Sequence, residues 1–169
     1  AMEHVQGLPI TEYCDRHKLS VKERLQLFLQ VCQGVQHAHH RGIIHRDIKP
    51  SNVLVSAPDE KPVAKIIDFG VAKELTQDPE ESLTVAGTVV GTPHYMSPEQ
   101  AQGHVHHIDG RSDVYSLGII LYELLTGLRP YRLDGLSMLD ATRTIVETEP
   151  KRLSDRHPQF RGDLDTIVA

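Results

Sequence analysis

The chain has 169 residues, 39% of them hydrophobic, which is enough to bury a core and suits one domain. Its formal net charge of -5, with no dominant basic face, argues against a nucleic-acid or anionic-membrane partner. The most apolar stretch, "SLGIILYELLTG", is about half a bilayer span and contains Glu123, so we expect no membrane-crossing segment in this chain.

The first residues, "AMEHVQG", carry no signal peptide, and two distant cysteines, Cys14 and Cys32, indicate reduced thiols. We therefore expect a cytoplasmic protein. The start without Met or a helix cap indicates a piece of a longer parent protein, whose membrane anchor, if it has one, lies outside these residues.

Ser20 and Glu23 form the S-x-x-E pattern of a helix capping box. Apolar residues then recur at helical spacing up to Ala38, and Gly42 is a plausible stop, so we predict one long helix. Two short apolar runs, 43–44 and 53–55, bracket the polar stretch "HRDIKPSN", and we predict that both are buried strands.

A hairpin is predicted next, because "NVLV" and "AKII" flank the turn-rich stretch "SAPDEKP". From Gly70 to about Gly110 the sequence has little periodicity and many Gly, Pro, Thr and Ser residues. Such a long stretch without elements is typical of a functional or mobile segment.

A central core helix is predicted to open at residues 112–113, because the apolar side chains after it occur almost all the way round a helix. Further helices are predicted over 137–149, capped by Ser137, and over 161–169. The fold class is therefore mainly α with short β-hairpins (α+β).

The polar stretch between the first two apolar runs offers the chemistry of phosphoryl transfer. This reaction needs a carboxylate to accept a hydroxyl proton, a cation to steady the phosphate, and oxygen ligands for Mg²⁺. Asp47, Lys49 and Asn52 supply these groups, and Asp68 at the end of a hairpin strand could hold Mg²⁺ together with Asn52. The alternative role of such residues is loop capping and turn formation.

Three motifs, "HRDIKPSN", "DFG" and "GTPHYMSPE", occur in this order and resemble those of the C-terminal lobe of eukaryotic-type Ser/Thr protein kinases, most closely the bacterial members. The resemblance spans residues 1–169, from the hinge-like "MEHVQG" to the start of the late helices. No G-x-G-x-x-G loop is present, and neither Lys65 nor Lys73 lies upstream of the first motif as the family's strand lysine does. We therefore expect a partial catalytic domain with the N-terminal lobe absent.

The resemblance implies an enzyme that transfers the ATP γ-phosphate, with Mg²⁺, to Ser/Thr hydroxyls of a protein substrate. It implies that Asp47 is the catalytic base, that Lys49 contacts the γ-phosphate, and that Asn52 and Asp68 bind the metal.

For the adenine of ATP, the resemblance implies contacts with the hinge backbone at Glu3 and Val5, above a floor formed by Leu54. Lys49 together with Thr92 favours Ser/Thr over Tyr as the acceptor.

Regulation is implied by Arg46, because in such "RD" kinases a phosphorylated residue docks on this arginine and orders the activation loop. The matching position is Thr88, four residues before Thr92. Weaker candidates are Thr76, Ser82 and Thr84.

Four residues have structural roles by the resemblance. His45 is expected to pack near Phe69, and Asp113 to hold the catalytic loop through its backbone amides. Glu99 normally pairs with an Arg of a later helix that this chain does not reach, so we expect it to lose order or find a substitute.

Two alternatives remain open for the function. One is a non-catalytic, kinase-like scaffold that acts by binding partners, and the other, less favoured, is a small-molecule kinase. We expect this chain alone to be nearly inactive, because half of the nucleotide cleft is missing, and its open lobe face to invite self-association.

The sequence contains 11 histidines, which raises the alternative of a zinc site. The candidates in "HAHH" and "HVHH" lack Cys, Asp or Glu at ligand spacing, so zinc is disfavoured. We expect His37, His39 and His40 to lie near a helix end, where a cation is mildly favoured.

Overall fold

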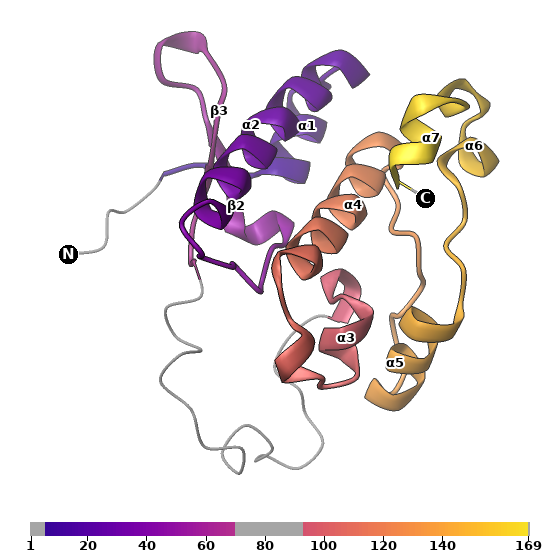
Figure 1. Ribbon diagram of the computed structural model, residues 1–169. Helices are drawn as coiled ribbons and strands as arrows, with labels where there is room; N and C mark the ends of the chain where they lie inside the picture. Colours follow the sequence, from indigo (N-terminus) through magenta and orange to yellow (C-terminus); the bar gives the residue numbers. More distant parts are fainter. Residues whose placement is uncertain (1–5, 70–92, 169) are drawn as a thin grey trace.

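The computed structural model describes residues 6–69 and 93–168, and Figure 1 shows a helix-rich fold with one small sheet. The sheet has three antiparallel strands in the order β1-β2-β3: Leu8–Pro9 (β1), Val53–Ser56 (β2) and Val63–Ile66 (β3). β2 and β3 form the predicted hairpin. β1 is not predicted by the sequence, because two residues are too few to show an alternating pattern.

The described residues contain seven α-helices: Ile10–Arg16 (α1), Val21–His39 (α2), Pro98–Ala101 (α3), Gly110–Thr126 (α4), Met138–Glu147 (α5), Leu153–Arg156 (α6) and Asp163–Val168 (α7). Helices α2, α4, α5 and α7 confirm the four predicted helices. The sequence does not predict α1, α3 or α6, because elements this short show no clear helical period.

Both ends of α2 follow the predicted signals. Ser20 accepts a hydrogen bond from the Glu23 backbone N–H, and the Glu23 carboxylate accepts one from the Ser20 N–H at 2.7 Å. At the other end, Gly42 has a left-handed φ of 73°, which a glycine adopts without strain. Its N–H donates to the carbonyl of His39 at 2.9 Å, so Gly42 turns the chain away from the helix toward the polar loop.

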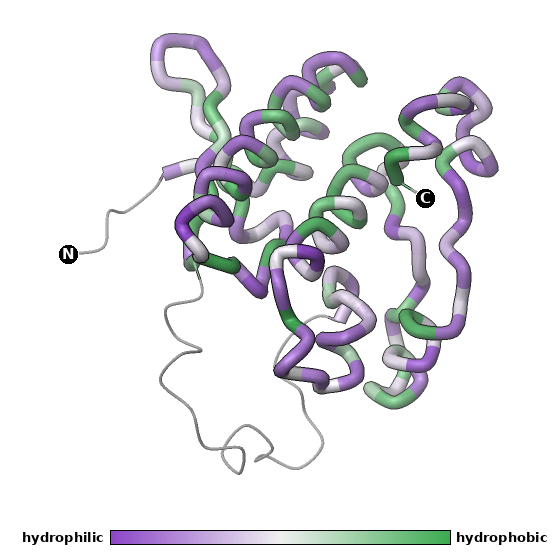
Figure 2. The backbone as a smooth tube through the Cα atoms, in the orientation of Figure 1, coloured by the Kyte–Doolittle hydropathy of each residue, from purple (hydrophilic) through white to green (hydrophobic). Residues whose placement is uncertain are grey.

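Helix α4 lies at the centre of the molecule, between α2 and the C-terminal helices (Figure 1). Its apolar side chains are buried almost throughout, for example Ile120 at 0% and Leu124 at 2% exposure, and Figure 2 shows the matching hydrophobic stretch. Two details differ from the prediction. The helix begins at Gly110, capped by Asp109, rather than at 112–113, and Val114 is 61% exposed.

The prediction of a strand at Ile43–Ile44 is wrong. Neither residue belongs to a strand or pairs with one in the part of the chain that the structure describes, and Ile43 is 46% exposed. In the sheet β2 pairs with β1 and β3 and not with residues 43–44, which follow the turn at the end of α2. β-Propensity alone does not make a strand.

Both cysteines are free thiols in the structure, as predicted. Burial raises the pKa of Cys14 to about 11, so its thiol stays protonated at neutral pH. Among the residues that the structure describes, no helix has the length and apolar character needed to cross a bilayer.

Candidate active site

The loop of residues 45–52, here called the catalytic loop, is anchored to the first turn of α4. The backbone N–H groups of His45 and Arg46 donate to the two carboxylate oxygens of Asp113, at 2.9 and 2.8 Å. Asp113 is only 1% exposed, and Nε2 of His39 lies 2.7 Å from its Oδ2. Because hydrogen bonds to a carboxylate shielded from water are strong, Asp113 fixes the backbone of the loop.

Three candidate catalytic side chains lie together on this loop. Nζ of Lys49 is 2.8 Å from Oδ2 of Asp47. Nδ2 of Asn52 donates to the backbone carbonyl of Asp47 at 2.8 Å and to its Oδ2 at 3.2 Å. Asn52 is 6% exposed, whereas the Asp47 side chain is 51% exposed, so the carboxylate remains open to an incoming molecule. With Nδ2 bound to Asp47, Oδ1 of Asn52 is an oxygen of the kind that ligates hard cations.

Asp68 is brought to the same place by the hairpin. The backbone N–H of Ile67 donates to the carbonyl of Asn52 at 2.9 Å, directly before Asp68. Asp68 is exposed and has a left-handed φ of 58°, which is unfavourable for a residue other than glycine. Strained backbone of this kind is typical of functional sites, where the surrounding contacts hold it.

His45 lies beneath the loop as a packed and hydrogen-bonded side chain. Its Nε2 is 2.9 Å from the carbonyl oxygen of Ile67, and Nδ1 is 3.3 Å from the backbone N of Asp47. Since a carbonyl only accepts and an N–H only donates, Nε2 carries the proton and Nδ1 accepts. The ring also contacts Phe69, with centroids 4.8 Å apart.

Arg46 has an unfavourable backbone conformation and a buried side-chain N–H without a partner in the described residues. Its φ is 66°, again in the left-handed region. Its Nε atom is buried and has no hydrogen-bond partner within residues 6–69 and 93–168. A buried donor without a partner is costly, so Arg46 is a candidate for binding an anion.

Glu99 has a partner, the hydroxyl of Ser112, which donates to its carboxylate. Burial acts to raise the pKa of Glu99, but the hydrogen bonds from Ser112, its own backbone and Ser97 outweigh burial and leave the pKa below its usual value. Within the described residues Ser112 is thus the side-chain partner of Glu99 from the next long helix, α4.

The remaining predicted site residues are only partly covered by the structure. Leu54 is half-buried in β2, paired with Pro9 on one side and Lys65 on the other. The other residues predicted for adenine binding, for the acceptor preference and for regulation of the loop lie outside the described residues: Glu3, Val5, Thr76, Ser82, Thr84, Thr88 and Thr92.

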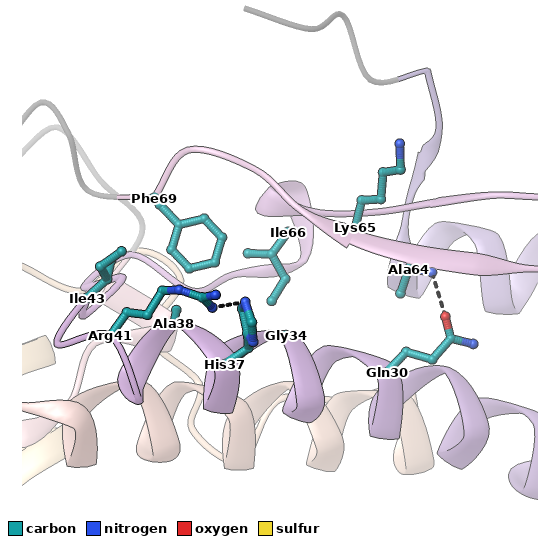
Figure 3. Close-up of a pocket in the computed structure, with 10 residues that line it drawn as sticks. All are labelled: Gln30, Gly34, His37, Ala38, Arg41, Ile43, Ala64, Lys65, Ile66 and Phe69. Carbon is teal, nitrogen blue, oxygen red and sulfur yellow. Dashed lines mark hydrogen bonds between the residues drawn. The ribbon is translucent and has the colours of Figure 1, made fainter.

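Next to Asp68 lies an open, mainly apolar hollow of about 590 Å³, here called the α2–β3 hollow. Figure 3 shows its lining: Gly34 and Ala38 of α2 form the floor, and Ile66 and Phe69 face them from the hairpin side. The approach is close, since a Cβ on Gly34 would lie 3.1 Å from Cδ1 of Ile66. At one end Gln30 binds the edge of β3, accepting from the Ala64 N–H at 3.0 Å.

The histidines do not form a metal site in the described part of the chain, where no three His, Cys, Asp or Glu side chains gather as ligands. His37 and His39 lie in the last turn of α2, as predicted. The rings of His104 and His107 are 5.7 Å apart.

Comparison with known sequences relates this chain to one family. The protein kinase domain matches residues 1–166. Serine/threonine-protein kinase PknB of Mycobacterium tuberculosis is 38% identical over 168 residues, which cover 99% of this chain and 26% of PknB. Serine/threonine-protein kinase Pkn1 of Myxococcus xanthus is 43% identical over 168 residues, covering 99% of this chain and 23% of Pkn1. The chain thus spans about a quarter of the length of the curated relatives it matches.

Solved structures lead to the same fold. A point mutant of the kinase domain of Mycobacterium tuberculosis PknI is 25% identical, with a TM-score of 0.64, and the match covers 99% of this chain and 56% of that one. Rad53 1–466 in complex with AMP-PNP is 23% identical, with a TM-score of 0.69, and the match covers 99% of this chain and 41% of Rad53. At that identity the likeness to Rad53 bears on the fold alone.

Proposed function

Because this chain belongs to the protein kinase family, with bacterial Ser/Thr kinases of eukaryotic type among its relatives, we propose that it is the C-terminal lobe of the catalytic domain of such a kinase. The parent protein then transfers the γ-phosphate of ATP to Ser or Thr hydroxyls of a protein substrate. One observation carries the proposal: Lys49 and Asn52 both lie within hydrogen-bonding distance of Asp47, on a loop anchored from α4.

Each of these side chains has a task in the proposed reaction. Asp47 accepts the proton of the substrate hydroxyl, for which its half-exposed carboxylate is accessible. Lys49, which pairs with Asp47 here, turns to the γ-phosphate when ATP is bound and stabilises its charge. The anchored backbone keeps both groups in place, because phosphoryl transfer depends chiefly on positioning and electrostatics.

Asn52 and Asp68 suit a magnesium site. Mg²⁺ prefers oxygen ligands, and Oδ1 of Asn52 and the exposed carboxylate of Asp68 are of this kind. A metal ion held there supplies positive charge against the nucleotide phosphates. The adenine then lies over Leu54 and meets the backbone at Glu3 and Val5.

Arg46 is the proposed receptor for an activating phosphate. The buried Nε without a partner in the described residues is a donor suited to a phosphoryl group. We assign Thr88 as the phosphorylated residue, and Thr92 as part of the surface that accepts the substrate.

The α2–β3 hollow is the proposed contact site of the N-terminal lobe. This chain covers 56% of the solved PknI kinase domain, so close to half of such a domain has no counterpart here. An apolar hollow beside Asp68, with Ile43 46% exposed at its rim, is suited to packing against that missing part.

A phosphorylation assay with radiolabelled ATP and Mg²⁺ tests the proposal. We expect the full-length protein to label a Ser/Thr-containing protein acceptor, and the 169-residue chain alone to show only background labelling. A full-length protein without activity would refute the kinase assignment. Robust turnover by the isolated chain would refute its assignment as a lobe that needs its other half.

A further inference from the structure

The side chain of Gln100 bridges α3 and the catalytic loop. Its Nε2 donates to the backbone carbonyl of Arg46 at 2.7 Å, and its Oε1 accepts from the backbone N–H of Ser97 at 3.0 Å. Because the carbonyl only accepts and the N–H only donates, the orientation of the amide is determined. One end of the amide therefore caps α3, and the other end holds the loop.

The bond to Arg46 fixes the peptide unit that precedes Asp47. In this unit the oxygen of Arg46 is bound by Gln100, and the N–H of Asp47 donates to Nδ1 of His45 at 3.3 Å. Arg46 has a left-handed φ of 66°, which a residue other than glycine keeps only where its surroundings hold it. Without Gln100 the oxygen end of the peptide unit loses this restraint, and the side chain of Asp47 can turn with it.

The contact also completes a closed ring of hydrogen bonds. The N–H of Arg46 donates to Oδ1 of Asp113 at 2.8 Å, and the neighbouring Ser112 donates to Glu99, which precedes Gln100. Arg46 is thus held at its N–H from α4 and at its carbonyl from α3, and the two helices are themselves joined. A restrained unit of this kind is what preorganisation of a catalytic group requires.

We propose that Gln100 is a positioning residue of the kinase reaction, which orients the proton acceptor Asp47 through the carbonyl of Arg46. This inference rests on the proposed function. It differs from a general role in stability, because the two ends of the Gln100 amide can be separated chemically.

Gln100→Glu in the full-length protein removes the donor end of the side chain and keeps its acceptor end. A glutamate keeps the oxygen that accepts from Ser97, and Glu is itself a capping-box residue, but the donor that faces the Arg46 carbonyl is lost. We expect kcat to fall about tenfold, as for the loss of one restraint on a catalytic group, with the KM for ATP unchanged and a Tm no lower than that of Ser97→Ala, the capping variant described next. Gln102→Glu is the matched control, because Gln102 is exposed at the end of the same helix, and we expect it to leave all three quantities unchanged.

Two further measurements distinguish positioning from loosening of α3. Ser97→Ala removes the hydroxyl that accepts from the Gln100 backbone N–H but keeps the Nε2 donor, so we expect a lower Tm without the tenfold loss of kcat. Amide hydrogen exchange over residues 45–48 should be faster in Gln100→Glu than in the wild type.

The inference is overturned if Gln100→Glu has the kcat of the wild type, if Ser97→Ala reproduces its loss of kcat, or if exchange over residues 45–48 is unaltered. Failure of the proposed function is a separate result, in which the wild-type protein itself transfers no phosphate. The exchange measurement then still tells whether Gln100 restrains the loop.

Discussion

The guanidinium of Arg24 donates from Nη1 to the backbone carbonyl of Leu124 at 3.0 Å and so joins the start of α2 to the end of α4. The same side chain donates from Nε to the carbonyl of Leu19 at 3.0 Å and pairs with Asp15 at 2.8 Å. Carbonyl groups at a helix end lack partners within the helix, and Arg24 satisfies one of them. The contact keeps α4, which carries Asp113, in place against the helix that leads into the catalytic loop.

Arg24→Ala should therefore destabilise the protein. We expect a loss of roughly 2 kcal/mol in the free energy of unfolding, because the bonds from Arg24 to backbone carbonyls are half-buried while the exposed ion pair with Asp15 adds little. Urea unfolding followed by circular dichroism measures it. Arg16→Ala, at an exposed position of α1, is the control and should change stability by less than about 0.5 kcal/mol. Equal stability of the two variants would show that Arg24 does not join the helices in solution.

The stability of the C-terminal region should fall in acid because of Asp165. Its carboxylate accepts from the backbone N–H of Ser154 at 3.0 Å and from the Ser154 hydroxyl at 2.6 Å, and these bonds hold the pKa of Asp165 below its usual value. A carboxyl whose pKa is lower in the folded state stabilises the protein above its unfolded-state pKa of about 3.8, and this contribution is lost as the pH falls through the lower, folded-state pKa.

Asp165→Asn tests this assignment, since an amide can still accept from the Ser154 N–H but does not titrate. Unfolding free energies measured from about pH 7 to about pH 3 should fall less steeply toward acid in this variant than in the wild type. Asp163→Asn, exposed in the same helix, should keep the wild-type slope. An unchanged slope in Asp165→Asn would assign the acid sensitivity to other carboxyls, such as Glu99.

The parts of the fold that the sequence predicts have local signals. Ser20 and Glu23 lie three residues apart and cap α2, and the hairpin is visible as two apolar runs around a turn. The grouping of Asp47 with Asn52 is also local, because both lie on one short loop. The prediction of a strand at Ile43–Ile44 is wrong. A strand forms only where a second segment pairs with it, and a run of two apolar residues does not show whether such a segment exists.

The contacts that hold the site join distant parts of the chain, and no local pattern indicates them. His39 lies in a run of histidines and has nothing in its neighbourhood that indicates Asp113, 74 residues away. Ser97 and Gln100 form the same kind of capping box as Ser20 and Glu23, but this pattern does not indicate the second bond, from Gln100 to the loop. The motifs therefore indicate the candidate site residues and, through the family resemblance, the anchor Asp113, whereas the contacts made by His39 and Gln100 require the structure.

The open α2–β3 hollow should make the 169-residue chain associate with itself when the rest of the domain is absent. Exposed apolar surface favours association, and Ile43 is 46% exposed at the rim of this hollow. Light scattering over a concentration series should show a rising mean mass for the chain. Ile43→Lys, which adds a cation at the Arg41 end of the hollow, should keep it monomeric, whereas Val114→Lys, on the exposed face of α4, should not. A monodisperse wild-type chain at high concentration would contradict this expectation.

Asp47→Asn removes the proposed proton acceptor and keeps the hydrogen bonds of the loop. The amide has nearly the shape of the carboxylate and its oxygen can still accept from Lys49 and Asn52, so the hydrogen bonds of the loop are retained. What is lost is the ability to take up the proton of the substrate hydroxyl. In the full-length protein we expect kcat to fall by a factor of about 10² to 10⁴, with the KM for ATP and the Tm nearly unchanged.

Lys49→Met is the informative comparison, because it leaves the proton acceptor and removes the charge proposed to face the γ-phosphate. If Asp47 acts as the base, kcat of the Asp47 variant should recover little as the pH rises, since the amide does not ionise, whereas the Lys49 variant should keep the pH profile of the wild type at a lower rate. A kcat of Asp47→Asn close to that of the wild type would mean that the carboxylate serves only to hold Lys49 and Asn52. The proton acceptor would then have to be sought elsewhere in the site.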